Sequence, residues 1–202
     1  MITKMMRSLI PAALPDKQKA LLLAGTKLFH RYGFSKVSVE EICRLAVVSK
    51  VTFYRYYRGK DGLILAILEL IFSDMIRRSN ELLDSERGLK EKFDRVIVMK
   101  QEFIDILGEE LTQGFFEHPT ARAYYEKLSR ESYASFRAFL IREQERGGIN
   151  PELNIDLFMA ILRELSGLIS RRVLEDKCAS FKDMVAQVNE ILVYGLINRE
   201  AT

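Results

Sequence analysis

Residues 38–60 read SVEEICRLAVVSKVTFYRYYRGK, and this stretch decides the fold. Ser38, followed three residues later by Glu41, is a capping box, which is a signal for the start of a helix. Apolar residues then recur at helical spacing. Ser49 offers a second N-cap, and about two helical turns follow it. The stretch therefore predicts two short helices joined by a tight turn, over Val39–Ala46 and Lys50–Tyr57.

The second of these helices has an apolar face and a basic face. At roughly 100° per residue, Phe53 and Tyr57 share the face expected to pack inward, and Arg55 points the opposite way. Small apolar, hydroxyl and basic groups on an outer face suit a DNA major groove, where apolar groups meet thymine methyls and Arg or Lys reaches guanine. A solvated surface role stays open for Arg55. The candidates for contact with base edges are Lys50, Val51, Thr52 and Arg55.

The spacing of apolar and aromatic residues in this region resembles the tetracycline-repressor (TetR) family of bacterial regulators. The resemblance covers about residues 19–65. Val47 stands where that family usually has glycine in the turn, and Gly25 stands where it usually has alanine; the first could alter the angle between the two helices. The matching residues are Ala24, Leu28, Phe29, Gly33, Ile42, Cys43, Ala46, Val48, Ser49, Phe53, Tyr54, Tyr56, Tyr57 and Lys60.

The resemblance implies roles for three residues at the DNA backbone. In the family a tyrosine at the position of Tyr54 contacts a phosphate, and Tyr56 stands where many relatives carry a histidine at the backbone. Lys60 matches a lysine at the start of the fourth helix, where its charge adds to the helix N-terminus in holding a phosphate. The candidate DNA-binding set is completed by Lys36, Ser38 and Ser49.

Charge is divided unevenly along the chain. Residues 1–60 hold 12 Lys/Arg against 3 Asp/Glu, and residues 61–202 hold 19 against 25, within a net charge of +3. A basic N-terminal part on an acidic remainder is typical of a DNA-binding head attached to a separate body. The two cysteines, Cys43 and Cys178, are interpreted as buried inert thiols in a reducing cytoplasm, with a redox switch as the alternative.

Periodicity predicts an all-α protein of about nine helices in three parts. Residues 1–15 are expected to be a flexible basic arm, 16–60 a helix-turn-helix DNA-binding domain, and 61–202 a helical effector-binding and dimerisation domain. No run of apolar residues is long enough to span a membrane, so a cytoplasmic protein is expected. Outside residues 38–60 the expected helices are Asp16–Tyr32, about Lys60–Leu83, Lys90–Leu107, Leu111–Phe116 (or a continuation after a kink at Gly108), Pro119 to Gly147, Ile155–Leu174 and Phe181–Asn198.

The last two expected helices carry more apolar surface than one body can cover. Their leftover faces could pair with a second copy in a four-helix bundle, and the resemblance implies the same dimer. Burial of both helices inside a monomer is the alternative. Two heads on a two-fold axis would read an inverted repeat. The expected dimer residues are Phe158, Leu162, Leu165, Ile169, Val185, Val188 and Leu192.

Aromatic residues are frequent in the body, and for each of them core packing is the simpler interpretation. The resemblance implies that some line a cavity for a small apolar or amphipathic effector. Arg95, Arg122 or Glu126 could add polar specificity there. The expected pocket residues are Phe93, Phe103, Phe115, Phe116, Tyr124, Tyr125 and Phe136.

The residues needed for an enzyme are missing from the sequence. Only two histidines occur, and there is no Cys/His zinc cluster, no Glu-x-x-His pair and no Gly-rich phosphate loop. No cofactor is expected. The sequence therefore predicts a homodimeric DNA-binding regulator, a repressor that an effector relieves. A regulator controlled by a protein partner, or an all-helical adaptor that binds no DNA, remain the alternatives.

Overall fold

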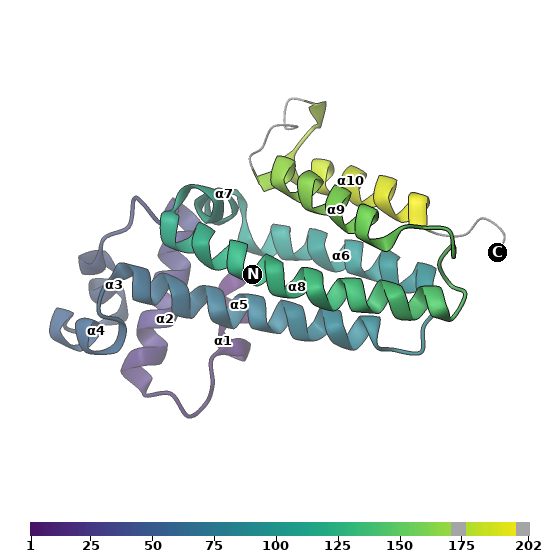
Figure 1. Ribbon diagram of the computed structural model, residues 1–202. Coiled ribbons are helices and arrows are strands. Elements are labelled where there is room, and N and C mark those ends of the chain that lie inside the picture. Colours follow the sequence, from purple (N-terminus) through teal and green to yellow (C-terminus); the bar gives the residue numbers. More distant parts are fainter. Residues whose placement is uncertain (171–176, 197–202) are drawn as a thin grey trace. The chain divides into compact units, whose positions relative to one another are not determined.

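The computed structural model describes residues 1–170 and 177–196. The regular elements of these residues are helices, as Figure 1 shows. In chain order they are α1 (Ile2–Leu9), α2 (Asp16–Tyr32), α3 (Val39–Ala46), α4 (Lys50–Tyr57), α5 (Lys60–Leu83), α6 (Leu89–Leu107), α7 (Glu109–Glu117), α8 (Pro119–Glu145), α9 (Ile155–Ser170) and α10 (Phe181–Leu196).

The all-α prediction is confirmed, and several helix ends agree with the sequence. The bounds of α2 to α5 are those expected. Gly108, at φ 73°, separates α6 from α7, so these are two helices rather than one kinked helix. The expected ends of the last two helices, Leu174 and Asn198, lie outside the described residues.

Helix α1 is the additional element, and it corrects the prediction of a flexible arm over residues 1–15. Ile2 and Met6 lie one turn apart and are 3% and 0% exposed, and α1 packs against α2. A helix of eight residues is too short to be stable in water by itself. Burial of these two side chains therefore holds α1 in place, which local sequence signals do not report.

The chain forms two compact units. The first contains Met1–Arg78 and Ile104–Glu126, and the second contains Ser79–Phe103 and the described residues from Lys127 onward. The expected domain boundary after residue 60 thus lies inside the first unit. Because residues 104–126 belong to that unit, the predicted DNA-binding head (residues 16–60) is built together with α7 and the start of α8.

Close helix packing in the first unit depends on the glycine that departs from the family pattern. A Cβ at Gly25 of α2 would lie 2.7 Å from Cδ2 of Leu63 on α5, so glycine lets the two helices approach. In the connection after α2, the ring of Phe34 meets the ring of Phe115 of α7 edge-on, with 5.9 Å between centroids. The head is therefore held between α5 and α7.

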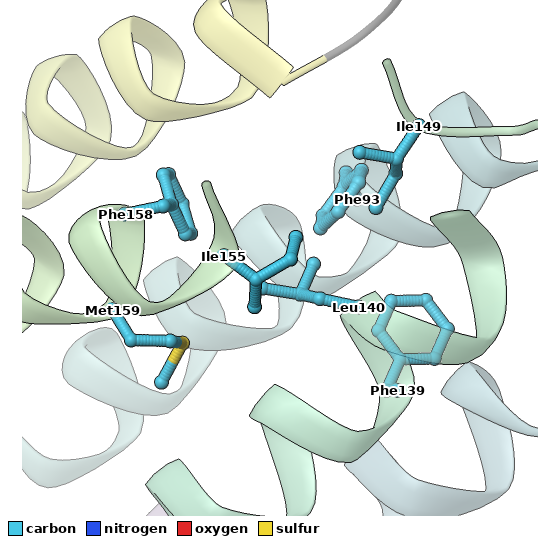
Figure 2. Close-up of a cluster of buried hydrophobic side chains, with 7 residues drawn as sticks. All are labelled: Phe93, Phe139, Leu140, Ile149, Ile155, Phe158 and Met159. Carbon is cyan, nitrogen blue, oxygen red and sulfur yellow. The ribbon is translucent and has the colours of Figure 1, made fainter. Parts of the chain in front are cut away.

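The second unit has its own apolar core (Figure 2). Beside it, Lys92 of α6 and Glu143 of α8 form an ion pair at 3.5 Å, with side chains only 4% and 11% exposed. The ammonium group of Lys92 also lies 5.4 Å from the centre of the Phe139 ring. The buried core residues are Phe93, Phe139, Leu140, Ile149, Ile155, Phe158 and Met159.

Candidate nucleic-acid interface

The start of α3 is fixed by the predicted capping box. The backbone N–H of Glu41 donates to Oγ of Ser38 at 3.2 Å, and the backbone N–H of Ser38 donates to Oε2 of Glu41 at 2.8 Å. The Ser38 hydroxyl also donates to Oε2 of Glu41, at 2.8 Å, and the two bonds that this carboxylate accepts, from the Ser38 N–H first and the hydroxyl second, hold the pKa of Glu41 below its ordinary value. Ile42 on the inner side of α3 is fully buried. Local bonds therefore set where α3 begins, and one buried side chain fixes its rotation.

The turn between α3 and α4 is made by Val47 in the left-handed conformation, at φ 54° and ψ 45°. Its N–H donates to the Arg44 carbonyl at 3.3 Å, and the N–H of Val48 donates to the Cys43 carbonyl at 3.0 Å. This is the position where glycine was expected from the family pattern. The turn is kept with a β-branched residue at a cost of about 1–2 kcal/mol.

Helix α4 presents the outer face that the sequence predicts. Ser49 caps it, because Oγ of Ser49 accepts from the N–H of Thr52 at 3.2 Å. Phe53 and Tyr57 are 0% and 7% exposed, as expected for the inner face. The phenol of Tyr57 donates to the carbonyl of Gln18 on α2 at 3.4 Å, and burial raises its pKa to about 12. Tyr57 therefore stays un-ionised and fixes α4 to the head.

The ten predicted DNA-binding residues all lie between residues 36 and 60. Val51 is 82% exposed and Tyr54 is 50% exposed. Side chains that are exposed at this surface can meet a duplex without rearrangement of the head. The exposed members are Lys36, Ser38, Ser49, Lys50, Val51, Tyr54 and Arg55, and the half-buried members are Thr52, Tyr56 and Lys60.

Two of the basic candidates already have partners on the surface. Nζ of Lys50 lies 3.1 Å from Oε2 of Glu40, and both side chains are largely exposed. An exposed pair of this kind contributes about 0–1 kcal/mol, so a phosphate or a base can replace Glu40. The guanidinium of Arg55 lies 5.3 Å from the centre of the Tyr56 ring, which orients it along α4.

Lys60 has a structural role that the sequence did not indicate. Its Nζ donates to the carbonyls of Phe34 and Val37, at 2.9 and 3.1 Å. These carbonyls belong to the connection between α2 and α3. Two of the three ammonium hydrogens are therefore used to tie α5 to that connection, and one is left for a phosphate.

Sequence reasoning missed two exposed residues of this surface. Val47 is 90% exposed, and Arg58 is an exposed C-cap at φ 55°. Arg58 and Val47 are the non-glycine residues with positive φ in the described chain. The dipeptide Arg58-Gly59 after an apolar-periodic segment was an available signal for the end of α4, with a cation beside it.

The expected pocket residues are divided between the two units. In the first unit, Phe115, Phe116, Tyr124 and Tyr125 gather around Phe72 and each other, with ring centroids between 5.4 and 6.3 Å apart. In the second unit, Phe93 and Phe136 pack with Phe139, and Phe103 is half-buried. These rings fill space in the described state, which agrees with the simpler interpretation of core packing.

A cleft of about 600 Å³ occurs elsewhere in the first unit, between α1, α2, α4 and α5. Its wall includes Leu14, Leu22, Tyr57 and Leu70, together with the charged side chains of Glu69 and Arg77. None of the seven expected pocket residues lines it. It exists because α1 packs beside α2, a long-range contact that local sequence patterns do not predict.

Three of the expected dimer residues of α9 and α10 are turned toward their own unit. Phe158 and Val185 are 9% and 8% exposed, and Leu162 packs against the core of Figure 2. Leu165 and Val188 are half-buried, and the side chains of Ile169 and Leu192 lie outside the described residues. Among the described side chains of these helices, the large exposed apolar ones are Leu157, Ile161 and Ile191.

Other site types find little support in residues 1–170 and 177–196. They contain no cluster of three or more His, Cys, Asp or Glu able to hold a metal ion, and no helix among them could span a membrane. Cys43 and Cys178 are not joined to each other. Burial raises the pKa of the Cys43 thiol, which favours the unreactive thiol form.

Comparison with known proteins places this surface in a family. Residues 21–67 match the family model described as "Bacterial regulatory proteins, tetR family". The HTH-type transcriptional regulator YdgC of Bacillus subtilis is 28% identical over 190 residues, which are 90% of this chain and 93% of that protein. The HTH-type transcriptional repressor NemR of Escherichia coli is 31% identical over 45% of this chain and 44% of its own.

A solved structure shows the same fold. The transcriptional regulator FadR from Bacillus subtilis, in complex with stearoyl-CoA, aligns with a TM-score of 0.66 at 19% identity, over 87% of this chain and 97% of that one. The family match covers α3, α4 and the connection that Lys60 secures. Residues 21–67 therefore form a DNA-binding domain similar to that of the tetR family of bacterial regulatory proteins, and the chain is a DNA-binding transcriptional regulator.

Proposed function

We propose that the chain is a homodimeric repressor that binds an inverted-repeat operator and leaves it when a small apolar or amphipathic ligand binds. The observation that carries the proposal is the outer face of α4, where Lys50, Val51, Tyr54 and Arg55 are exposed around an inner face that is fully packed. Helices of this kind enter the major groove with their N-terminal residues toward the base edges.

The division of labour on α4 follows from the chemistry of each side chain. Arg55 and Lys50 can donate to guanine, and Val51 can contact a thymine methyl. Tyr54, Tyr56, Lys36 and Ser38 would donate to phosphates, which position the protein without reading sequence. Lys60 would add one hydrogen bond to a phosphate while keeping its two bonds to the head. Arg58, exposed beside them, would add a further backbone contact.

Homodimer formation is proposed through α9 and α10. Leu157 and Ile161 lie one turn apart on α9 and are 60% and 48% exposed, and Ile191 of α10 is 71% exposed. Apolar side chains at this spacing on neighbouring helices suit an isologous contact with a second copy. The partly buried Leu165 and Val188 would lie at the margin of that contact.

Release by a ligand is proposed from the aromatic residues and from the relatives. NemR is named a repressor, and FadR was solved with stearoyl-CoA. In this chain, Phe115, Phe116, Tyr124 and Tyr125 already contact one another or Phe72. A ligand would have to separate these rings, and its preference for the opened state would set how far DNA binding shifts.

The test is selection of bound duplexes from a random pool, followed by titration of the enriched sequence at several salt concentrations. We expect an inverted repeat, with affinity that falls steeply as salt rises. Analytical ultracentrifugation should show a dimer at micromolar concentration, and acyl-CoA or fatty acid added to the complex should release DNA. An adaptor protein would enrich no sequence, and a regulator controlled by a protein partner would keep its operator in the presence of every amphipath tried.

A further inference from the structure

The backbone of Val47 is strained, and contacts within the described chain do not offset the cost of that strain. A β-branched side chain rarely adopts the left-handed conformation found here, because its Cβ substituents crowd the backbone. Apart from Arg58, the other residues with positive φ in the described chain are glycines. Strain of this kind persists where the surroundings enforce it, and it gathers at functional sites.

The turn requires the backbone conformation but not the valine. The hydrogen bonds that close the turn use the N–H groups of Val47 and Val48 and the carbonyls of Cys43 and Arg44, and glycine would make them equally well. The Val47 side chain is 90% exposed, so packing within the chain does not stabilise it. The reason for a valine must therefore lie outside the described chain.

Position supplies that reason, given the proposed function in which α4 enters the major groove. Val47 lies two residues before the N-cap Ser49, at the end of α4 that approaches base edges in this motif. It also lies four residues before Val51, which is 82% exposed. The exposed methyl groups of Val47 have one favourable partner in that groove, which is the 5-methyl group of thymine.

We infer that Val47 is a specificity-determining residue that contacts a thymine methyl in each half-site. This contact extends the base readout beyond Lys50–Arg55 to a base pair that glycine in the same turn would not read. Val51 contacts a second thymine from the first turn of α4, so the half-site holds two thymines with separate protein partners.

The experiment compares the full chain with Val47→Gly on its selected operator. Each thymine of a half-site is replaced, one at a time, by deoxyuridine, which removes only the 5-methyl group. The wild-type chain should lose affinity roughly four-fold at the Val47 thymine, the value of one buried carbon. Val47→Gly should bind the unmodified operator more weakly and show no further loss at that thymine.

Two further variants separate the contact from an effect on folding. Val47→Asn tolerates the left-handed conformation but lacks the methyl groups, and it should lose the same uracil sensitivity. Val51→Ala should lose sensitivity at a different thymine and keep that of Val47. Thermal melting should place Val47→Gly above the wild type, so that stability and affinity move in opposite directions.

Three results would overturn the inference. One is a selected half-site without thymine. Another is a wild-type chain indifferent to every thymine-to-uracil change, and the third is a Val47→Gly variant with the wild-type pattern of sensitivity. In each case the operator still binds, so the proposed function survives. Failure of the wild-type chain to enrich any duplex would instead overturn the proposed function, and this contact with it.

Discussion

The helix-turn-helix of residues 38–60 and the core of the second unit are stabilised over different distances along the chain. The caps of α3 and α4 are hydrogen bonds between residues three apart. The core of Figure 2 joins residues from α6, α8 and α9, and its ion pair joins residues 51 positions apart, Lys92 and Glu143. A segment fixed by local bonds can leave its outer side chains exposed for binding, whereas the core uses its side chains for cohesion.

The largest effect is expected at the ion pair of the second unit. Glu143→Met leaves the buried ammonium of Lys92 without its carboxylate, and breaking a buried pair costs about 3–5 kcal/mol. The double variant Lys92→Met/Glu143→Met should regain most of that stability, because two apolar side chains need no partner. Urea denaturation followed by circular dichroism measures both. A loss below about 1 kcal/mol for the single variant would show that water reaches this pair.

A smaller loss of folding stability is expected at a glycine that has no room for a side chain. A Cβ at Gly62, in the first turn of α5, would lie 1.9 Å from the Tyr57 carbonyl oxygen. Gly62→Ala must therefore move backbone, and we expect a loss near the upper end of overpacking costs, about 3 kcal/mol. Gly88→Ala is the matched control, because no atom lies within 4 Å of its Cβ position. Equal melting temperatures for the two variants would contradict the expectation.

The exposed face of α4 should separate binding from stability. Arg55→Ala should cost about 1–3 kcal/mol of binding free energy and relax preference at one base position. Its free energy of unfolding should change by less than about 0.5 kcal/mol. Tyr54→Phe should weaken binding to all sequences alike. Fluorescence anisotropy on operator and random DNA measures the binding affinity of both variants. Equal losses on the two DNAs for Arg55→Ala would count against base readout.

Lys60→Met tests a residue of the same surface that also has a structural role, for comparison with Arg55→Ala. It should weaken DNA binding and also lower the free energy of unfolding by about 1–3 kcal/mol, because two carbonyls lose a charged donor. A variant that loses only DNA binding would show that these two hydrogen bonds contribute little.

The smallest effect is expected at the cap of α3. Ser38→Ala should cost about 1 kcal/mol of stability. Ser135→Ala, at an exposed position in the middle of α8, should change stability by less than about 0.5 kcal/mol. Because the pKa of Glu41 is lowered in the folded chain by its bonds to Ser38, its contribution is fully present above the ordinary pKa of glutamate. It is lost as pH falls through the lowered pKa. Ser38→Ala removes the hydroxyl bond to Glu41 but keeps the larger backbone contribution, so it should flatten the acid limb of the pH–stability curve only in part.

The same difference between local and long-range contacts explains which features could be predicted from the sequence. The bounds of α3 and α4 were predictable because Ser38, Glu41 and Ser49 act on neighbouring backbone groups. Helix α1 was not, because its two buried residues depend on α2. The two hydrogen bonds from Lys60 to the carbonyls of Phe34 and Val37 could not be predicted for the same reason. Aromatic content identified residues of the bundle but could not assign Phe115 and Phe93 to different units.

The departure at position 47 shows a further limit of sequence patterns. The family comparison marked Val47 as unusual, and the structure shows that it keeps the turn that glycine would make. A pattern of residue types reports the common solution to a backbone requirement. Only the conformation of this chain shows that the requirement is met here at an energetic cost.

Helix α1 has a consequence for transplanting the DNA-binding head. A fragment cut at residues 16 and 60 would lose Ile2 and Met6, which are buried, and Phe115, whose ring meets Phe34. It would expose the apolar surface that these side chains cover. Chimeric sensors that join such a fragment to a foreign receptor would aggregate or melt. An interchangeable reader must carry the first nine residues, α5 and a substitute for α7, so in this protein the portable unit is larger than the motif that reads DNA.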